Sequence, residues 1–467
     1  MDATTSTLDR PALSPPVVVG AGAAVLAAGA LGFVVDPRLG LVALGAPAAL
    51  IVVTAPAAGV ALLLFALPLE ELAALAPGGF LTLHKLLGMA VVAGWLLHAL
   101  LQRQPIRVPS IALVPGAFVL WAAVSALWAV DPAMATHMTL TYVQLVALYL
   151  LVVNVLDTPA ALRRALHAHV AGAVVLCIFG LYLTGQGILQ GGRTAIVVDH
   201  ELLMEPNGFA AALLVPIAIC LAGGLDRTRP TWERVAVTLA GTLCVTTVVL
   251  TMSRGALLAL GAMVIVASVA RGQIALLVGA VLLAVPGALL AGPEFWQRLA
   301  EGATLADRGA GRLDILHVGS VIVREHPLIG VGLGGFPLVY YEYLAQAAGI
   351  SWQHALAVAH TLEKAPHNIY LGVTAELGIV GLGLLVAAVA VHLRAALRAW
   401  RRLEAAHHPA AALVLAGAMA LLAMAVQGAF FDVEHRKSFW LALGLAAIAA
   451  RRPTAVLPVA VPLRSAA

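Results

Sequence analysis

The chain has 467 residues, of which 62% are hydrophobic and only 11% are charged. A typical soluble domain has about 25% charged residues, and surface-to-volume scaling prevents a water-soluble fold from burying this much apolar surface. A cytosolic enzyme, a disulfide-stapled secreted domain and a disordered chain are therefore excluded, and the protein must use lipid as a solvent. The small formal net charge of +4 does not indicate a nucleic-acid partner.

Apolar runs follow one another along most of the chain. A membrane-spanning helix needs about 20 apolar residues, and Leu, Val and Ala fill the runs without alternation, which favours helices over a β-barrel. The runs are 17–35, 38–54, 57–75, 82–101, 110–130, 136–156, 160–185, 206–224, 233–252, 255–270, 273–291, 366–393, 409–430 and 437–450. Four of them (38–54, 57–75, 255–270 and 437–450) are short, which leaves re-entrant or kinked segments open. The sequence predicts an all-α polytopic membrane protein with about 12 to 14 membrane helices.

Arginine and lysine counts in the loops predict the orientation of these helices. One set of alternate loops, together with both termini, holds 16 basic residues, and the other side holds 11. The richer side is expected to be cytoplasmic, and nothing at the N-terminus resembles a cleaved signal peptide. The predicted organisation is a cytoplasmic tail (1–16), a bundle of membrane helices (17–291), a periplasmic lid loop (292–365), C-terminal membrane helices (366–450) and a cytoplasmic tail (451–467).

Several basic residues stand in short loops of the predicted outer side, where the orientation rule disfavours them. They are Lys85, Arg193, Arg254, Arg436 and Lys437. An arginine at membrane depth costs roughly 2.5–3.5 kcal/mol, so such a residue is a candidate for function. The alternative is snorkelling to the headgroups, which is the preferred interpretation for Arg436 and Lys437.

The lid loop shows helical periodicity over Glu294–Ala303 and Arg312–Arg324. A glycine-rich stretch, 330–335, follows the second of these. It lacks the preceding strand and following helix of a nucleotide-binding loop. We interpret it as a flexible turn that brings the backbone close to the membrane surface.

His367 follows the lid loop, directly after Pro366. Because proline suits the first turn of a helix, a helix is expected to begin here and to place His367 at its N-terminus. The helix dipole disfavours an imidazolium at this position and so favours a neutral base; an interfacial anchor is the alternative. Glu376 lies in the same predicted helix, where a base or a polar helix partner is expected.

No metal or cofactor site is expected. The nearest approach, Asp432 to His435, stands beside Arg436 and Lys437, so ion pairing is the preferred interpretation. His354 and His360 are six residues apart and fall on different faces of a helix. The cysteines have neither metal nor disulfide spacing and are interpreted as core residues: Cys177, Cys220 and Cys244.

Four motifs in order resemble the bacterial O-antigen ligase family, which shares a superfamily with O-antigen polymerases and protein O-oligosaccharyltransferases. They are Glu205–Ala210, Ser253–Ala256, Arg312 with 326–332, and His367-Asn368 followed by Gly378 and Gly381. The resemblance covers roughly 190–450 and implies transfer of a glycan from undecaprenyl diphosphate to a hydroxyl of lipid A–core. This reaction takes place at the periplasmic face of the bacterial inner membrane, among membrane lipids.

The residues fit this chemistry in specific roles. Guanidinium groups bind phosphate bidentately and stay charged, so Arg254 and Arg312 are expected to clamp the donor diphosphate, with Arg193 next and Lys85 as a further candidate. His367 is expected to be the general base of a metal-independent, inverting attack. Residues that could orient groups or contact the acceptor are Asn368, Glu205, Asn207 and Glu376. Asn207 is also interpreted as a helix cap, and the acidic loop around Asp199–Glu205 as a partner for Arg193 or a solvated loop.

Other functions remain open. A polymerase of the same superfamily would use the same donor and a second lipid-linked repeat as acceptor. A protein O-oligosaccharyltransferase is less favoured, because the chain ends shortly after the last predicted helix. A lipid-linked glycan flippase is a transporter alternative, although no internal repeat of the kind common in transporters is evident. A scaffold protein is the non-catalytic alternative.

Overall fold

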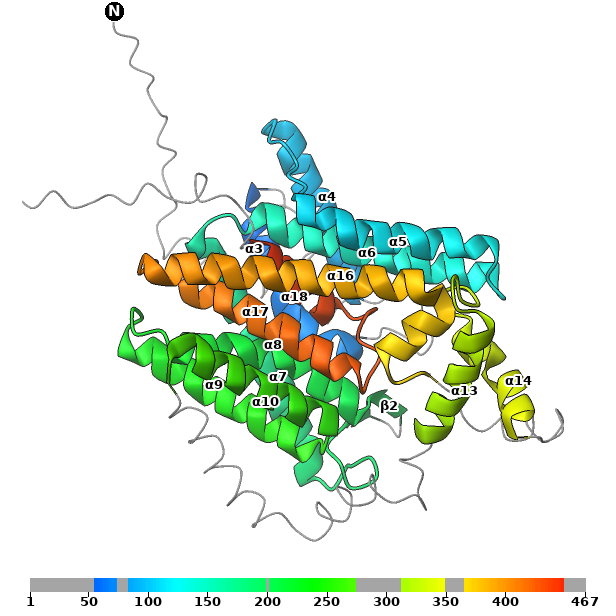
Figure 1. Ribbon diagram of the computed structural model, residues 1–467. Coiled ribbons are helices and arrows are strands. Elements are labelled where there is room, and N and C mark those ends of the chain that lie inside the picture. The colour runs from blue at the N-terminus through cyan, green and yellow to red at the C-terminus, as the bar shows by residue number, and fades with distance from the viewer. Residues whose placement is uncertain (1–53, 74–82, 199–200, 274–311, 349–364, 449–467) are drawn as a thin grey trace, which may run out of the picture.

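We describe the protein from a computed structural model, which covers residues 54–73, 83–198, 201–273, 312–348 and 365–448. Over these residues the chain is almost entirely helical (Figure 1). Eight helical segments in this part of the chain are long and apolar enough to cross a membrane. The predicted class, an all-α polytopic membrane protein, is confirmed. The runs 17–35 and 273–291, nearly all of 38–54, the helix Glu294–Ala303, and His354 and His360 lie outside the described residues.

The described helices coincide with the predicted runs. The eight candidate spans are the joined segments η2 (Ser110–Ala112), α5 (Leu113–Val124) and η3 (Ser125–Leu127), then α6 (Pro132–Val155), α7 (Pro159–Gly185), α8 (Pro206–Gly224), α9 (Thr231–Leu250), α10 (Arg254–Arg271), α16 (Ile369–Ala405) and α17 (Ala411–Gly428). The shorter apolar elements are α3 (Pro56–Ala66) with η1 (Leu67–Ala73), α4 (Leu83–Leu101) and α18 (Lys437–Ile448). The run 57–75 therefore changes from an α-helix to a 3-10 helix at Leu67, whereas α10 is one regular helix.

Local sequence signals explain where several helices begin. Pro132 and Pro159 occupy the first positions of α6 and α7, where a missing N–H costs nothing. The side chain of Asp131 accepts N–H groups of the first turn of α6 at 2.9 and 3.0 Å, and the Thr158 hydroxyl caps α7 in the same way.

The centre of the bundle is formed by α8 and α17. Of the residues in the most apolar 18-residue stretch of each helix, 89% are buried within the protein in α17 and 78% in α8. In α5, α9 and α10 only 33% are buried. In Figure 1, α16 and α17 run side by side across the middle, with α5 and α6 on one side and α7, α9 and α10 on the other. The peripheral helices therefore present their apolar faces to lipid, while α8 and α17 form the packed core of the bundle.

A small β-hairpin connects α7 to α8, which the sequence analysis did not predict. Strands β1 (Ile196–Val198) and β2 (Glu201–Met204) pair antiparallel, with Ile196 opposite Met204. The hairpin turns the chain back towards the bundle and brings the residues on either side of it together.

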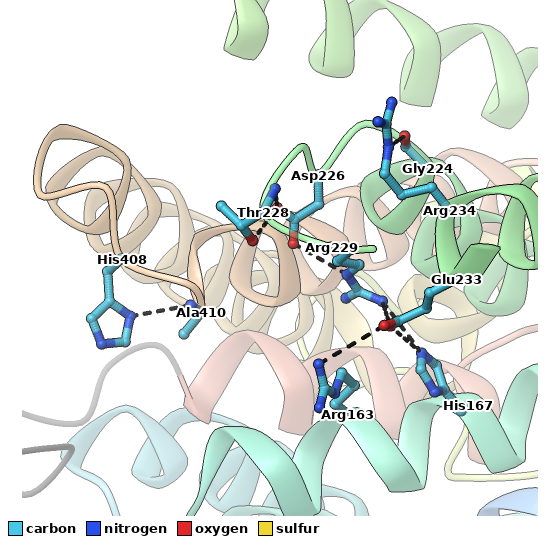
Figure 2. Close-up of polar contacts among 10 residues, drawn as sticks. All are labelled: Arg163, His167, Gly224, Asp226, Thr228, Arg229, Glu233, Arg234, His408 and Ala410. Carbon is cyan, nitrogen blue, oxygen red and sulfur yellow. Dashed lines mark hydrogen bonds and ion pairs between the residues drawn. The ribbon is translucent and has the colours of Figure 1, made fainter. Parts of the chain in front are cut away.

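The two ends of the bundle differ in their polar chemistry. At one end, the buried Arg229 donates to Asp226 at 3.1 Å and to Glu233 at 2.8 Å. Figure 2 shows His167 and Arg163 of α7 facing Glu233 from the other side, with His167 Nε2 3.3 Å from the carboxylate. This group, the Arg229 cluster, ties α7 to the start of α9. The opposite end, the His367 end, carries the turns 251–254 and 427–437 and the start of α16.

Two helices of the predicted lid, α13 (Arg312–Glu325) and α14 (Phe336–Ala348), pack on the start of α16 (Figure 1). The helical periodicity expected from residue 312 is confirmed. The unit has its own apolar core, formed by Ile315, Val318, Ile322, Val331, Phe336, Val339, Tyr340, Tyr343 and Ala375. Because Ala375 belongs to α16, this small core is continuous with the bundle.

Candidate active site

Connections from three parts of the chain meet at the His367 end. The backbone N–H of Thr194 donates to the carbonyl of Leu250 at 3.2 Å, which places the α7–α8 connection beside the turn between α9 and α10. The amide of Gln427 lies 3.5 Å from the carbonyl of Asn207, so the end of α17 is adjacent to the start of α8. These contacts assemble a polar site from segments far apart in the sequence.

The last turn of α17 separates the two helix starts that carry the main candidates. A Cβ on Gly255 would lie 2.6 Å from Phe430 Cβ and 2.7 Å from Gln427 Oε1, so α10 begins in direct contact with one side of this turn. A Cβ on Gly428 would lie 2.5 Å from the side chain of Ile369, the first residue of α16. The start of α10, with Arg254, and the start of α16, which follows His367, therefore both pack against the end of α17.

His367 has a left-handed backbone, with φ of +48°. Histidine is enriched among the few side chains that adopt this region. The helix begins later than expected: Asn368 is the N-cap, its side chain accepts the N–H groups of Tyr370 and Leu371 at 3.0 and 3.2 Å, and α16 starts at Ile369. Pro366 thus precedes the helix and is not in its first turn. His367 still stands at the positive end of the helix dipole, directly before its N-cap.

Asp432 supports His367 from the connection between α17 and α18. Its carboxylate accepts the backbone N–H groups of His367 at 3.0 Å and Asn368 at 3.1 Å, and one of its oxygens lies 3.9 Å from His367 Nδ1. The ion pairing expected for this stretch is therefore found for Asp432 with the imidazole of His367. Of the two cations beside it, Lys437 pairs with Glu70 of η1, and the guanidinium of Arg436 packs over the ring of Phe431 at 5.2 Å.

The environment of Asp432 opposes its ionisation. Burial, together with the nearby charge of Glu434, raises the pKa of this carboxyl to about 7, although His435 and the two backbone N–H bonds act in the opposite direction. Sequence reasoning noticed Asp432 as a poor metal ligand and missed its role, because the contact depends on how α17 and α18 return to the start of α16.

Arg254 is the first residue of α10 and is half-buried. The turn before it is tight, with Met252 at φ of +50°. A helix N-terminus attracts anions through its unpaired N–H groups and dipole, and a guanidinium at the same place adds a full positive charge. This is a favourable arrangement for a phosphate group.

Arg193 is held in a defined position beside the same turn. Its Nε donates to the carbonyl of Thr251 at 2.8 Å, and its Nη2 donates to Asn207 Oδ1 at 3.2 Å. Asn207 is therefore not the helix cap that we expected: Glu205 occupies the N-cap position of α8, and Asn207 lies within the first turn. Asp199 and His200 lie outside the described residues, so the expected pairing of Arg193 with the acidic loop stays a prediction.

Some of the buried side-chain oxygens at this end lack a hydrogen-bond partner among the residues that the structure describes. They are Ser253 Oγ, Gln427 Oε1 and Glu434 Oε2. Leaving a buried polar group unsatisfied costs about 1–3 kcal/mol. Such groups next to Arg254 and Asp432 are the kind that a polar ligand satisfies.

The remaining candidates lie on neighbouring elements. Arg312 is the first residue of α13, which packs on α16 near His367, but its side chain lies outside the description. Lys85 is near the start of α4, which packs on η1, and none of the contacts above involves it. The Glu376 carboxylate binds backbone N–H groups of the lid, rather than the base or helix side chain that was expected.

The fold and this site define a multi-pass membrane protein with a polar, arginine- and histidine-containing site at one end of its helix bundle. A family model described as O-Antigen ligase matches residues 239–386, which are about a third of the chain. The matched segment contains Arg254, Arg312, His367 and Glu376, and the predicted resemblance is confirmed over these residues. No curated protein matches the chain. The family match supports a membrane glycosyltransferase of the O-antigen ligase and polymerase superfamily.

Proposed function

We propose that the protein transfers a glycan from undecaprenyl diphosphate to a hydroxyl of lipid A–core at the periplasmic face of the bacterial inner membrane. The observation that carries this proposal is that the start of α10, which bears Arg254, and the start of α16, which follows His367, both pack against the last turn of α17. A base and a phosphate-binding cation at one membrane-proximal site are what this reaction requires. The proposal includes the orientation in which both chain termini are cytoplasmic.

The cations bind the donor. Arg254, at the start of α10, contacts the diphosphate together with the helix N-terminus, and Arg193 is oriented towards the same turn by Thr251 and Asn207. Arg312 and Lys85 complete the clamp. Positive charge fixed here stabilises the negative charge that develops on the phosphate oxygen in the transition state.

His367 activates the acceptor. The neutral imidazole takes the proton from the acceptor hydroxyl as its oxygen forms a bond to the anomeric carbon of the donor sugar. The bond between that carbon and the phosphate oxygen breaks, and undecaprenyl diphosphate leaves with the electron pair. The configuration at the anomeric carbon is inverted. Asp432 holds the backbone of His367, and its negative charge stabilises the imidazolium that forms.

Sugar hydroxyls account for the unsatisfied polar atoms. Ser253 Oγ and Gln427 Oε1 are buried without a partner among the described residues, beside the start of α10. A hydroxyl both donates and accepts hydrogen bonds, so glycan hydroxyls match a site that offers both kinds of atom. Asn368 and Glu205 are the neighbouring polar side chains.

The direct test incubates the purified full-length protein with a glycan on undecaprenyl diphosphate and with lipid A–core, in the presence of EDTA. We expect the wild type to transfer the glycan, and His367→Ala to bind the donor with unchanged affinity but to transfer at least about a thousandfold more slowly. Arg254→Ala should weaken donor binding. If both variants transfer at the wild-type rate, the assignment is wrong.

The same experiment separates the alternatives. Lengthening of the glycan on its carrier when lipid A–core is omitted indicates a polymerase, which uses the same donor site. Movement of the donor across a vesicle membrane without any transfer indicates a flippase. Transfer that requires lipid A–core supports the ligase.

A further inference from the structure

The long helix α16 is broken ten residues after its cap. Gly378 has φ of +68° and ψ of −171°, which are not helical values. The break divides α16 into a short first segment, 369–377, and a long second segment, 379–405. His367 and Asn368 stand at the beginning of the first segment, so its direction determines where they lie.

A break inside a helix leaves carbonyl and N–H groups without their usual partners. Here the carbonyls before the break are satisfied from outside the helix: Ala375 accepts the N–H of Val331 at 2.9 Å, and Glu376 accepts the N–H of Gly332 at 2.8 Å. After the break, the N–H of Ile379 donates to the carbonyl of Pro327 at 2.9 Å. Residues 326–335, which we call the glycine loop, therefore replace the missing helical hydrogen bonds.

Two tryptophans of the α5–α6 region complete this pairing. The indole N–H of Trp121 donates to the carbonyl of Leu377 at 2.9 Å, and that of Trp128 donates to the carbonyl of Ile329 at 3.3 Å. The N–H of Leu333 donates to the Ser125 hydroxyl at 3.1 Å. The expectation of a flexible turn is therefore wrong, because the glycine loop is held on two sides.

Glycine is required where the backbones touch. A Cβ on Gly330 would overlap the backbone of Glu376, and a Cβ on Gly378 would overlap the backbone of Leu328. Both residues also have positive φ, which a glycine adopts at no steric cost. The glycine-rich composition thus serves the close approach of the loop to the broken helix.

The side chain of Glu376 adds the strongest link. Oε2 accepts the N–H of Gly334 at 2.9 Å, and Oε1 accepts the N–H of Phe336 at 3.2 Å. Phe336 is the first residue of α14, so the carboxylate also lies at the positive end of that helix dipole. Glu376 therefore connects the first segment of α16 to the start of α14.

We propose that Glu376 is a positioning residue that makes the lid unit, α13 with α14, and the His367-bearing segment 369–377 move as one body. The role rests on the proposed function of His367. When the lid packs against the break, the first segment keeps the direction that places His367 beside the end of α17. When this link is lost, the segment pivots at Gly378 and His367 is displaced from the acceptor.

The test compares Glu376→Gln with Glu342→Gln in the full-length protein. Both changes remove one carboxylate, but Glu342 is exposed on α14 and serves as the control. At position 376 the glutamine amide places an N–H₂ group against one of the two backbone N–H donors. Glu376→Asp keeps the charge and shortens the side chain, and serves as the second variant. The readouts are hydrogen exchange over 327–340 and 376–382, the rate at which diethyl pyrocarbonate modifies His367, donor affinity, and turnover.

We expect Glu376→Gln to speed exchange in both segments at least about tenfold and to change the modification rate of His367. Turnover should fall on the order of 100-fold, as misplacement of a catalytic group by about 1 Å predicts, with donor affinity unchanged. Glu376→Asp should show the same pattern to a smaller degree, and Glu342→Gln should match the wild type. Gly330→Ala should remove most of the additional effect of Glu376→Gln, because both changes weaken the attachment of the glycine loop to the first segment of α16.

Unchanged exchange in both Glu376 variants overturns the proposal, and so does faster exchange with wild-type turnover. A parallel loss of donor affinity, turnover and thermal stability also overturns it, because that pattern describes general unfolding. If the wild type transfers no glycan, the proposed function fails, and His367 modification still decides whether Glu376 positions this residue.

Discussion

The carboxylate of Asp432 accepts the backbone N–H of His367 at 3.0 Å, although the two residues are 65 positions apart. The second oxygen accepts the N–H of Asn368 at 3.1 Å. Asp432 thus stabilises the left-handed turn that precedes α16 and places a negative charge 3.9 Å from the imidazole.

Asp432→Asn should lower turnover by about 10- to 100-fold, because an amide provides one acceptor oxygen for two N–H groups and no charge for the imidazolium. Donor affinity should stay at the wild-type value, since the arginines are untouched. Steady-state kinetics with varied donor and acceptor check this. Wild-type turnover in Asp432→Asn would show that Asp432 supports only the fold.

Transfer should rise with pH through about 7. Burial and the charge of Glu434 raise the pKa of Asp432 to about 7, and only the ionised form accepts both N–H bonds at full strength. A pH–rate profile from 5 to 9 measures this. The rise should be weaker in Asp432→Asn, which lacks this carboxyl group.

The raised pKa of Asp432 has the opposite effect on stability: the protein should become less stable as the pH rises. The carboxyl titrates near 3.9 in the unfolded chain and near 7 in the folded protein, so the folded state binds more protons between these values. The contribution of Asp432 to the free energy of unfolding is therefore present below about pH 4 and is lost as the pH rises to about 7. Thermal unfolding in detergent at several pH values, compared with Asp432→Asn, checks the sign, and a gain in this contribution on raising the pH contradicts it.

Gly255→Ala should impair donor binding, whereas Gly261→Ala should not. A Cβ at position 255 would lie 2.6 Å from Phe430 Cβ and would push the start of α10, with Arg254, away from α17. Nothing lies within 4 Å of a Cβ at position 261 of the same helix, where alanine should stabilise the helix by up to about 1 kcal/mol. Donor affinity and the midpoint of thermal unfolding distinguish the two variants. Equal donor affinities contradict the packing argument.

Arg254→Lys should weaken donor binding about tenfold, although the charge is kept. A lysine ammonium is a point charge and loses the bidentate geometry that matches phosphate. Titration with undecaprenyl diphosphate measures the change. The same titration with undecaprenol, which carries no phosphate, is the control and should give equal affinities for both proteins.

Arg229→Ala should destabilise the fold by about 3–5 kcal/mol, because it removes the buried cation closest to the buried carboxylates of Asp226 and Glu233. Arg227 stands in the same connection and is exposed, so Arg227→Ala should change stability by less than about 0.5 kcal/mol. Unfolding monitored in detergent tests both. The turnover of any Arg229→Ala protein that remains folded should be normal, because the cluster lies at the other end of the bundle.

Most of the membrane helices were predictable because their signal is local. Runs of apolar residues with proline or a capping side chain at the start, as at Asp131 and Thr158, specify both the helix and its first turn. The break at Gly378 and the β-hairpin at 196–204 were missed. Each is stabilised by pairing with another segment, and no run of residues reports such a pairing.

The candidate site also contains residues that the sequence identified and contacts that only the structure shows. His367 and Arg254 were found because polar residues stand out in an apolar chain, where burying them in lipid is costly. Asp432 and Glu376 were visible in the sequence, but their partners were not. Both carboxylates accept backbone N–H groups, and every residue except proline carries such a group, so the sequence does not indicate which ones are chosen.

Composition and hydropathy by themselves determined that lipid is the solvent, that the chain is helical and which residues are candidates for chemistry, because the free energy of transferring a segment into the membrane is a sum over its own residues. Only the tertiary structure decided that Asp432 supports His367, that Arg193 contacts Asn207 and that the glycine loop completes the broken α16. These choices depend on distances between segments, since a hydrogen bond acts over about 3 Å and has no counterpart along the chain.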